Sequence, residues 1–109
     1  MTVEILYFDG CPNYRPLLAR MPPLLHRAGI DAAVASCSVP SEEAAQELRF
    51  LGSPTVRVDG RDVEPGAEER SDYGLKCRLY RTAEGISGQP PDTWIIAAAR
   101  DRMREAAGP

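Results

Sequence analysis

The sequence predicts an α/β fold: a four-stranded mixed sheet flanked by helices, with the element order β-α-β-α-β-β-α. Three observations predict it, namely an apolar run that ends in a turn near the N-terminus, segments with apolar residues at the helical period, and a hairpin-like stretch after them. Strand–helix–strand units favour parallel pairing with a right-handed crossover, whereas a hairpin adds antiparallel strands at the edge. The expected sheet is therefore mixed.

The first strand and helix are predicted at the start of the chain. "TVEILYF" (residues 2–8) is β-prone and the turn-forming pair Asp9-Gly10 follows it, so we expect a buried central strand. From Pro12 to Ala28 apolar residues recur at helical spacing, which predicts a helix that Gly29 ends. An interior proline removes a backbone hydrogen bond, so a kink or two shorter pieces are expected at Pro16, Pro22 and Pro23.

A second strand and helix follow, and then a hairpin. "IDAAVASC" (residues 30–37) predicts a strand. Ser41, with two glutamates directly after it, is the expected N-cap of a helix that ends near Gly52. Residues 55–64 contain two short β-prone runs separated by Asp59-Gly60, which is the sequence form of a β-hairpin.

The rest of the chain predicts a loop and a last helix. Residues 66–89 are rich in glycine and charge and poor in periodic apolar residues, so we expect a long inserted loop with one short ordered piece around "KCRLY". Asp92 or Thr93 is the expected N-cap of the final helix, "TWIIAAARDRMREAA". Its core-facing stripe is expected to comprise Trp94, Ile95, Ala98, Ala99 and Met103, with Arg102 at the edge.

Composition and charge limit the classes of function. We expect one domain over residues 1–109, because the chain is only long enough for one core. A net charge of −3 provides no basic surface for nucleic acid. No apolar stretch approaches the roughly 20 residues of a membrane span, and no secretory signal begins the chain, so we expect no membrane partner and a cytoplasmic location. Three widely spaced cysteines indicate free or reactive thiols, and no cofactor is expected.

The stretch "FDGCPN" (residues 8–13) places Cys11 where the chain leaves a strand and enters a helix. The N-terminal end of a helix stabilises a thiolate, which is the nucleophilic and metal-binding form of cysteine. Pro12 suits the first helical turn, Asn13 is placed to cap the helix or to hold a ligand, and Tyr14 either hydrogen-bonds a substrate or packs on the helix. The alternative is that Cys11 is a small buried apolar residue.

The element order and two segments resemble the thioredoxin-like superfamily. Cys11 falls in the loop that carries the catalytic cysteine in that family, and Ser53-Pro54-Thr55 is similar to the family's cis-proline segment, which starts the third strand and faces the cysteine. The resemblance implies a cis Ser53-Pro54 bond that turns the backbone of Ser53 toward a bound extended thiol substrate. Residues 66–89 have no counterpart in a minimal thioredoxin domain.

The "CPNY" sequence (residues 11–14) departs from the C-x-x-C motif of thioredoxins, because Tyr14 stands where the second cysteine would be. A disulfide within the motif is therefore impossible. "FDGCPN" also resembles small bacterial proteins of the "F-x-G-C-P-N" kind, described as thioredoxin-like or organomercurial-lyase-like. Organomercurial lyases have an aspartate at the place that Tyr14 takes here.

The leading functional prediction is a thiol-dependent oxidoreductase. The Cys11 thiolate would attack a protein disulfide or a low-molecular-weight thiol adduct, and Cys77 or an external thiol would release the resulting mixed disulfide. Cys77 is the candidate resolving residue because it lies among Lys76, Arg78 and Arg81, a setting that favours a thiolate. Cys37, at the end of a predicted strand, is expected to fill space.

Two alternatives stay open. Cys11 with Cys77 could capture a soft metal or an organometal without redox turnover, although no C-x-x-C spacing supports a site that uses all three cysteines. The chain could also be a thioredoxin-like scaffold that binds a partner and carries no chemistry.

Overall fold

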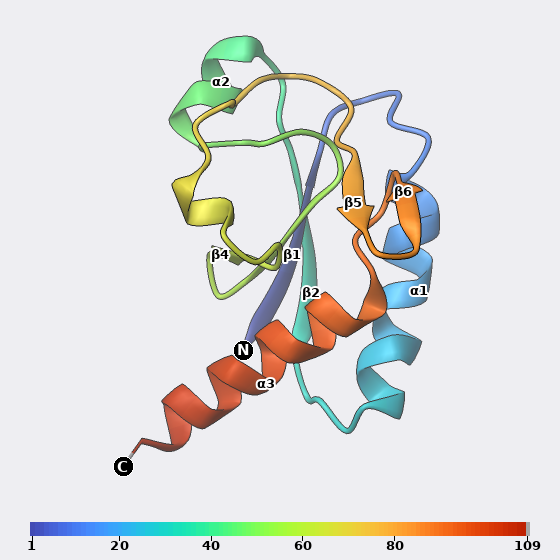
Figure 1. Cartoon of the computed structure of the whole chain (residues 1–109), viewed down its shortest axis with the longest axis vertical. Coiled ribbons are helices and arrows are strands. Elements are labelled where there is room, and N and C mark those ends of the chain that lie inside the picture. Colours follow the sequence, from blue (N-terminus) through green and yellow to red (C-terminus); the bar gives the residue numbers. More distant parts are fainter. Residues whose placement is uncertain (109) are drawn as a thin grey trace.

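The computed structural model describes residues 1–108 and contains the predicted four-stranded mixed sheet (Figure 1). Its strands are β1 (Thr2–Tyr7), β2 (Ala33–Ser38), β3 (Thr55–Val58) and β4 (Arg61–Asp62), in the spatial order β2-β1-β3-β4. β1 pairs parallel with β2 and antiparallel with β3, and β3 pairs antiparallel with β4 across the predicted Asp59-Gly60 turn. β1 is therefore one of the two inner strands, as the apolar N-terminal run indicates.

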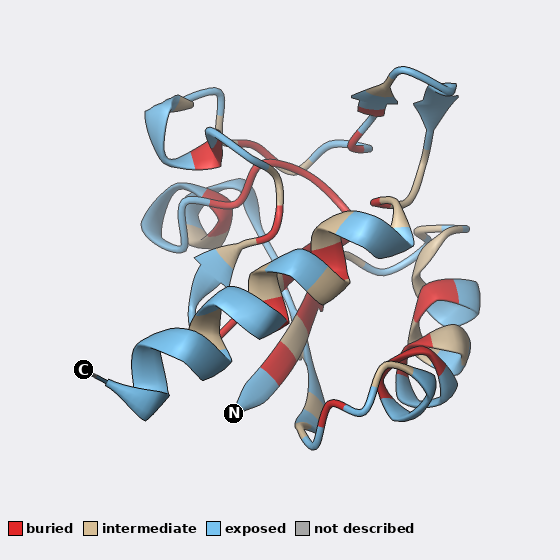
Figure 2. Cartoon of the chain, turned by 60° about the horizontal axis from the view of Figure 1, so that its bottom comes forward, coloured by how far each residue is buried: buried red, intermediate tan, exposed pale blue. Residues whose placement is uncertain are grey.

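Helices cover both faces of the sheet. α1 (Tyr14–Arg27) and α3 (Asp92–Ala107) pack on the face that carries Val3 and Ile5, whereas α2 (Glu42–Glu47) packs on the opposite face. Figure 2 shows the buried residues along the sides of these helices that face the sheet. The larger core comprises Val3, Ile5, Leu17, Met21, Leu24, Leu25, Ile30, Val56, Val58, Val63, Ile95 and Ala99. The smaller one comprises Leu6, Val39, Ala45 and Phe50.

α1 is one continuous helix, so of the two expected outcomes, a kink or two shorter pieces, the second is wrong. Pro16 lies in its first turn, where a backbone N–H has no partner within the helix. Pro22 and Pro23 lie in the interior but on the exposed side, while the neighbouring Met21 and Leu24 are buried. Burial of the apolar side against the sheet therefore maintains the helix through the prolines.

α2 begins as predicted and ends earlier than predicted. The Ser41 hydroxyl accepts a hydrogen bond from Ala44 N–H at 3.1 Å, which is the expected N-cap. The helix ends at Glu47 and not near Gly52, because Arg49 adopts a left-handed conformation with φ 54°. The Arg57 guanidinium donates to the carbonyl oxygens of Leu48 and Arg49, at 2.7 and 3.2 Å, and thereby satisfies the helix end.

Residues 66–89 contain more regular structure than the predicted loop. A 3-10 turn, η1 (Ala67–Glu69), is followed by an extended segment and by a two-stranded hairpin of β5 (Tyr80–Thr82) and β6 (Gly85–Ser87). Tyr80 is buried, and the Gly74 N–H donates to the Phe50 carbonyl oxygen at 2.9 Å. The expectation of a long loop with one ordered piece is therefore wrong, because this segment has a core residue and a tertiary hydrogen bond of its own.

The remaining differences concern boundaries. β2 begins at Ala33 and not at Ile30, and α3 begins at Asp92 with Pro91 as its N-cap, so neither Asp92 nor Thr93 caps it. Asp92 instead forms an ion pair with Arg20 of α1. Met103 is 43% exposed, which places it outside the predicted core stripe. Within residues 1–108, no helix combines the length and the apolar character that crossing a bilayer requires.

Candidate functional site

Cys11 lies in the loop between β1 and α1, where the sequence predicts it. Its N–H donates to the Phe8 carbonyl oxygen at 3.2 Å, and the residue is half-buried. Tyr14 is the first residue of α1, and Asn13 is the N-cap, although the Asn13 side chain makes no capping hydrogen bond. The cysteine therefore precedes the first turn of the helix and lies close to the carboxyl end of β1.

Ser53 contacts both cysteine-bearing segments. Its hydroxyl accepts a hydrogen bond from Phe8 N–H at 3.3 Å, which ties it to the start of the Cys11 loop. Its backbone N–H donates to the Lys76 carbonyl oxygen at 2.8 Å, and its carbonyl oxygen accepts from Arg78 N–H at 3.0 Å. These two bonds form a parallel bridge that places Cys77 beside Ser53. The Ser53–Pro54 peptide is cis, as predicted.

This arrangement corrects one expectation about Ser53. Both of its backbone polar groups bond to the segment of residues 76–78, so they do not face open space as a docking edge for an extended substrate. The chain's own segment occupies that place and carries an exposed thiol, that of Cys77. Paired residues in a ladder present their side chains to the same face, so Cys77 lies on the side from which the Ser53 hydroxyl reaches Phe8.

The three cysteines are all free, and they do not form one cluster. Cys37 lies on β2 opposite Leu6 and packs against the smaller core, in keeping with a filling role. Across residues 1–108 no group of three His, Cys, Asp or Glu side chains is arranged to hold a metal ion. A site made from all three thiols is therefore not formed.

The charges next to Cys77 are neutralised, which the sequence does not indicate. The Lys76 ammonium pairs with Asp72 at 3.0 Å, and Arg78 is only 2% exposed and binds both carboxylate oxygens of Asp62, at 2.8 and 3.0 Å. Burial lowers the pKa of Arg78, but the hydrogen bonds that it donates to Asp62, together with the charges of Tyr80, Asp62 and Glu64, outweigh burial and the net shift is upward. The expected electropositive setting of Cys77 is therefore wrong as far as these two residues are concerned.

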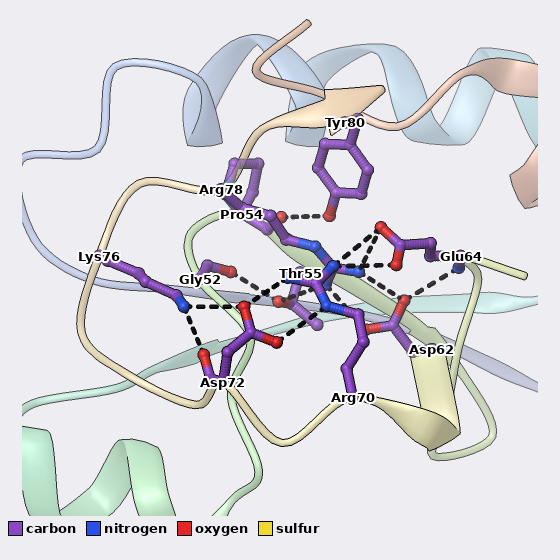
Figure 3. Close-up of polar contacts among 10 residues, drawn as sticks. All are labelled: Gly52, Pro54, Thr55, Asp62, Glu64, Arg70, Asp72, Lys76, Arg78 and Tyr80. Atoms are coloured by element: carbon purple, nitrogen blue, oxygen red, sulfur yellow. Dashed lines mark hydrogen bonds and ion pairs between the residues drawn. The ribbon is translucent and has the colours of Figure 1, made fainter. Parts of the chain in front are cut away.

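Arg78 belongs to a polar cluster that joins residues 66–89, the inserted segment, to the sheet (Figure 3). It also donates to the Thr55 hydroxyl at 3.0 Å, and its guanidinium lies 4.6 Å from the centre of the Tyr80 ring. The Tyr80 hydroxyl donates to the Pro54 carbonyl oxygen at 2.6 Å. Burial raises the pKa of Tyr80, so this hydroxyl keeps its proton and remains a donor.

Tyr14 stacks on Tyr7, the last residue of β1. The ring centres are 3.6 Å apart and the planes differ by 9°. The polar contact with the Tyr14 side chain, followed by desolvation, raises the pKa of Tyr7. Tyr14 also packs against the larger core, so at least part of its role is to join α1 to the end of β1.

The segment after β6 packs on the loop that carries Cys11. A Cβ atom on Gly88 would lie within 3.1 Å of three atoms of the Asn13 side chain, so only glycine fits this contact without movement. The Arg20 side chain of α1 donates to Gln89 at 2.8 Å and to the Pro90 carbonyl oxygen at 2.9 Å. Asn13 is therefore already in contact with the chain's own backbone.

The sequence singles out Cys11, Ser53 and Pro54 but gives no sign of the contacts around them that involve Asp62, Tyr80 and Gly88, and it indicates Arg78 only for its charge. A period of two could have identified this part of the inserted segment, because Cys77, Leu79 and Arg81 are exposed while Arg78 and Tyr80 are buried. The signal is hidden because the buried set contains an arginine and the exposed set a leucine.

Comparisons with models of protein families, with curated proteins and with solved structures find no match to this chain.

Proposed function

We propose that the chain is a thioredoxin-like thiol–disulfide oxidoreductase in which Cys11 is the nucleophile and Cys77 the resolving thiol. The observation that carries the proposal is the set of hydrogen bonds around Ser53, which ties the start of the Cys11 loop to the residues on either side of Cys77. The mixed sheet, with strand order β2-β1-β3-β4 and the Cys11 loop at the carboxyl end of the inner strand β1, supports the proposal.

The reaction uses two thiols and one disulfide. The Cys11 thiolate attacks one sulfur of the substrate disulfide, a Cys11–substrate bond forms, and the first substrate sulfur leaves as a thiolate that takes up a proton. The Cys77 thiolate then attacks the Cys11 sulfur, forms the Cys11–Cys77 bond and releases the second substrate thiol. Two protein cysteines are oxidised and the substrate is reduced; two molecules of a low-molecular-weight thiol then reduce the Cys11–Cys77 bond and are themselves oxidised to a disulfide.

The surrounding residues keep the two segments in place. Ser53 bonds to both segments, and Pro54 is held by the Tyr80 hydroxyl at its carbonyl oxygen. Gly88 and Asn13 pack together beside the Cys11 loop. Because Cys77 is exposed and Cys11 half-buried, both sulfurs are on accessible parts of the chain. In this proposal Ser53, Pro54 and Asn13 act by positioning the thiols.

The test measures what happens when the reduced protein meets less than one equivalent of the disulfide 5,5′-dithiobis(2-nitrobenzoate). The experiment uses a Cys37→Ser background, so that only the two proposed thiols remain. We expect both nitrothiobenzoate halves of the reagent to be released and a Cys11–Cys77 disulfide to appear in peptide mass spectra. With Cys77→Ser added, one half should remain attached to Cys11.

The matched control is the Cys37→Ser protein with Cys11→Ser added. In this variant Cys77 should hold the adduct, because no second thiol can displace it. An accumulating adduct in the protein that has both Cys11 and Cys77, with only one half of the reagent released, would contradict the proposal.

A further inference from the structure

Arg78 is the best-connected side chain near the proposed thiol pair. Figure 3 shows its guanidinium between Asp62, Glu64 and Thr55, with the ring of Tyr80 beside it. Its contacts come from β3, β4 and β5, so it joins three strands of the fold. It directly follows Cys77 in the chain, and its own N–H donates to the Ser53 carbonyl oxygen.

Arg78 is held in place twice, by its backbone N–H, which bonds to Ser53, and by its side chain, which bonds to Asp62. The backbone bond fixes the position along Ser53, while the bidentate pair with Asp62 prevents the residue from turning outward. Such paired hydrogen bonds between a guanidinium and a carboxylate are geometrically strict. The side chain of Arg78 is 1% exposed, and its Nε has no hydrogen-bond partner within residues 1–108, so the group is held by its two terminal nitrogens.

Side chains along residues 77–79 alternate between the two faces of the segment, and this alternation links the Arg78–Asp62 ion pair to Cys77. Because Arg78 faces inward, Cys77 and Leu79 on either side must face outward. A rotation that released Arg78 would carry the Cys77 sulfur away from the face it shares with Ser53. The orientation of the thiol therefore depends on the ion pair of Arg78 with Asp62, which lies on the other side of the backbone.

We propose that Arg78 is the positioning residue that fixes Cys77 for its attack on Cys11. The inference rests on the proposed function, because it concerns the second step of that reaction. It adds that the rate of this step is set by the contacts of Arg78 with Asp62 and Thr55, and not only by the presence of the two thiols. Displacement of a reacting group by about 1 Å can slow a reaction ~100-fold.

The test follows release of nitrothiobenzoate by stopped-flow absorbance in the Cys37→Ser background. The first phase is formation of the mixed disulfide, and the second is closure of the Cys11–Cys77 bond. With Arg78→Met we expect the first phase to be unchanged and the second to slow by ~100-fold. Arg70→Met is the matched control, because Arg70 binds Glu64 and Asp72 in the same cluster but is not adjacent to Cys77. It should leave the second phase close to that of the parent protein.

A second variant covers the case in which Arg78→Met does not fold, since that substitution leaves the partly buried carboxylate of Asp62 without its partner. Arg78→Gln with Asp62→Asn removes both charges together, and it should also slow only the second phase. Equal slowing of both phases, or a second phase unchanged in the folded variant, would overturn the positioning role. Release of only one nitrothiobenzoate half by the parent protein would instead refute the proposed function, so the two failures are distinguishable.

Discussion

Gly52 is the residue at which the packing of the inserted segment can be tested most directly. Its φ is +126°, and a Cβ atom built on it would lie 2.9 Å from Cβ and 3.1 Å from Cα of Arg78, and 3.1 Å from the Lys76 carbonyl oxygen. Two of these atoms belong to the backbone that pairs with Ser53. In the variant Gly52→Ala the segment cannot stay in place, because the contacts are shorter than van der Waals distance.

Gly85 provides the matched control. Its φ is +124°, almost that of Gly52, but a Cβ atom there would have nothing within 4 Å. Both substitutions place an L-residue in an unfavourable backbone region, which costs about 1–3 kcal/mol. Only Gly52→Ala adds overpacking, which typically costs a further 1–3 kcal/mol or so. The two variants should therefore differ by about 1–3 kcal/mol in the free energy of unfolding.

Urea denaturation followed by far-ultraviolet circular dichroism measures the difference. For a domain of roughly this size each kcal/mol corresponds to about 4–8 °C in Tm, so thermal unfolding gives an independent value. Gly52→Ala should also increase the rate of alkylation of Cys77 by iodoacetamide, because the segment loses its contact with Ser53. Equal destabilisation by both alanines, with no change at Cys77, would refute the close packing of residues 76–78 on Gly52.

Two further outcomes follow from single contacts. Tyr80→Phe removes the buried hydrogen bond to the Pro54 carbonyl oxygen and leaves that oxygen without its donor. We expect the free energy of unfolding, measured in urea, to fall by about 1–3 kcal/mol. Tyr73→Phe is the control and should have almost no effect, because the Tyr73 hydroxyl makes none of the hydrogen bonds found within residues 1–108. The Leu75 N–H, followed by Gln46, lowers the pKa of Glu42, so this carboxylate stabilises the fold above its unfolded pKa of about 4.3 and the stabilisation is lost as pH falls through the lower, folded value. The Tm difference between the protein and Glu42→Gln should therefore be largest near pH 7 and should shrink below about pH 4; a difference that is constant over that range would contradict the role of Glu42.

Local rules predict much of the sheet and of the helices. The apolar run before Asp9-Gly10, the helical period after it and the Asp59-Gly60 turn lead to β1, α1 and the β3–β4 hairpin, because each of these signals depends on neighbouring residues alone. The end of α2 was not predictable in this way. Leu48 and Arg49 stop the helix with the help of Arg57, which comes from the next strand along the chain.

The inserted segment shows the limit of hydropathy as a guide. Arg78 is buried because Asp62, Glu64 and Thr55 satisfy it, and these partners precede it by 14 to 23 residues. Leu79 is 55% exposed although it is apolar. A prediction from the apolar pattern would therefore bury Leu79 and expose Arg78, the reverse of what the structure has. Cys11 was identifiable from its neighbours, whereas the place of Cys77 depends on these tertiary contacts.

The bridge between Ser53 and Cys77 has a consequence for how dissolved thiols compete with Cys77 in the proposed reaction. A reactive group tethered in the same chain behaves as though it were present at roughly millimolar concentration or above, even with a flexible connection. In the proposed reaction a dissolved thiol must therefore be abundant before it can intercept the Cys11 adduct ahead of Cys77. Reducing metabolites would then act chiefly on the closed disulfide and determine how quickly the protein is recycled, with little influence on which molecules it attacks.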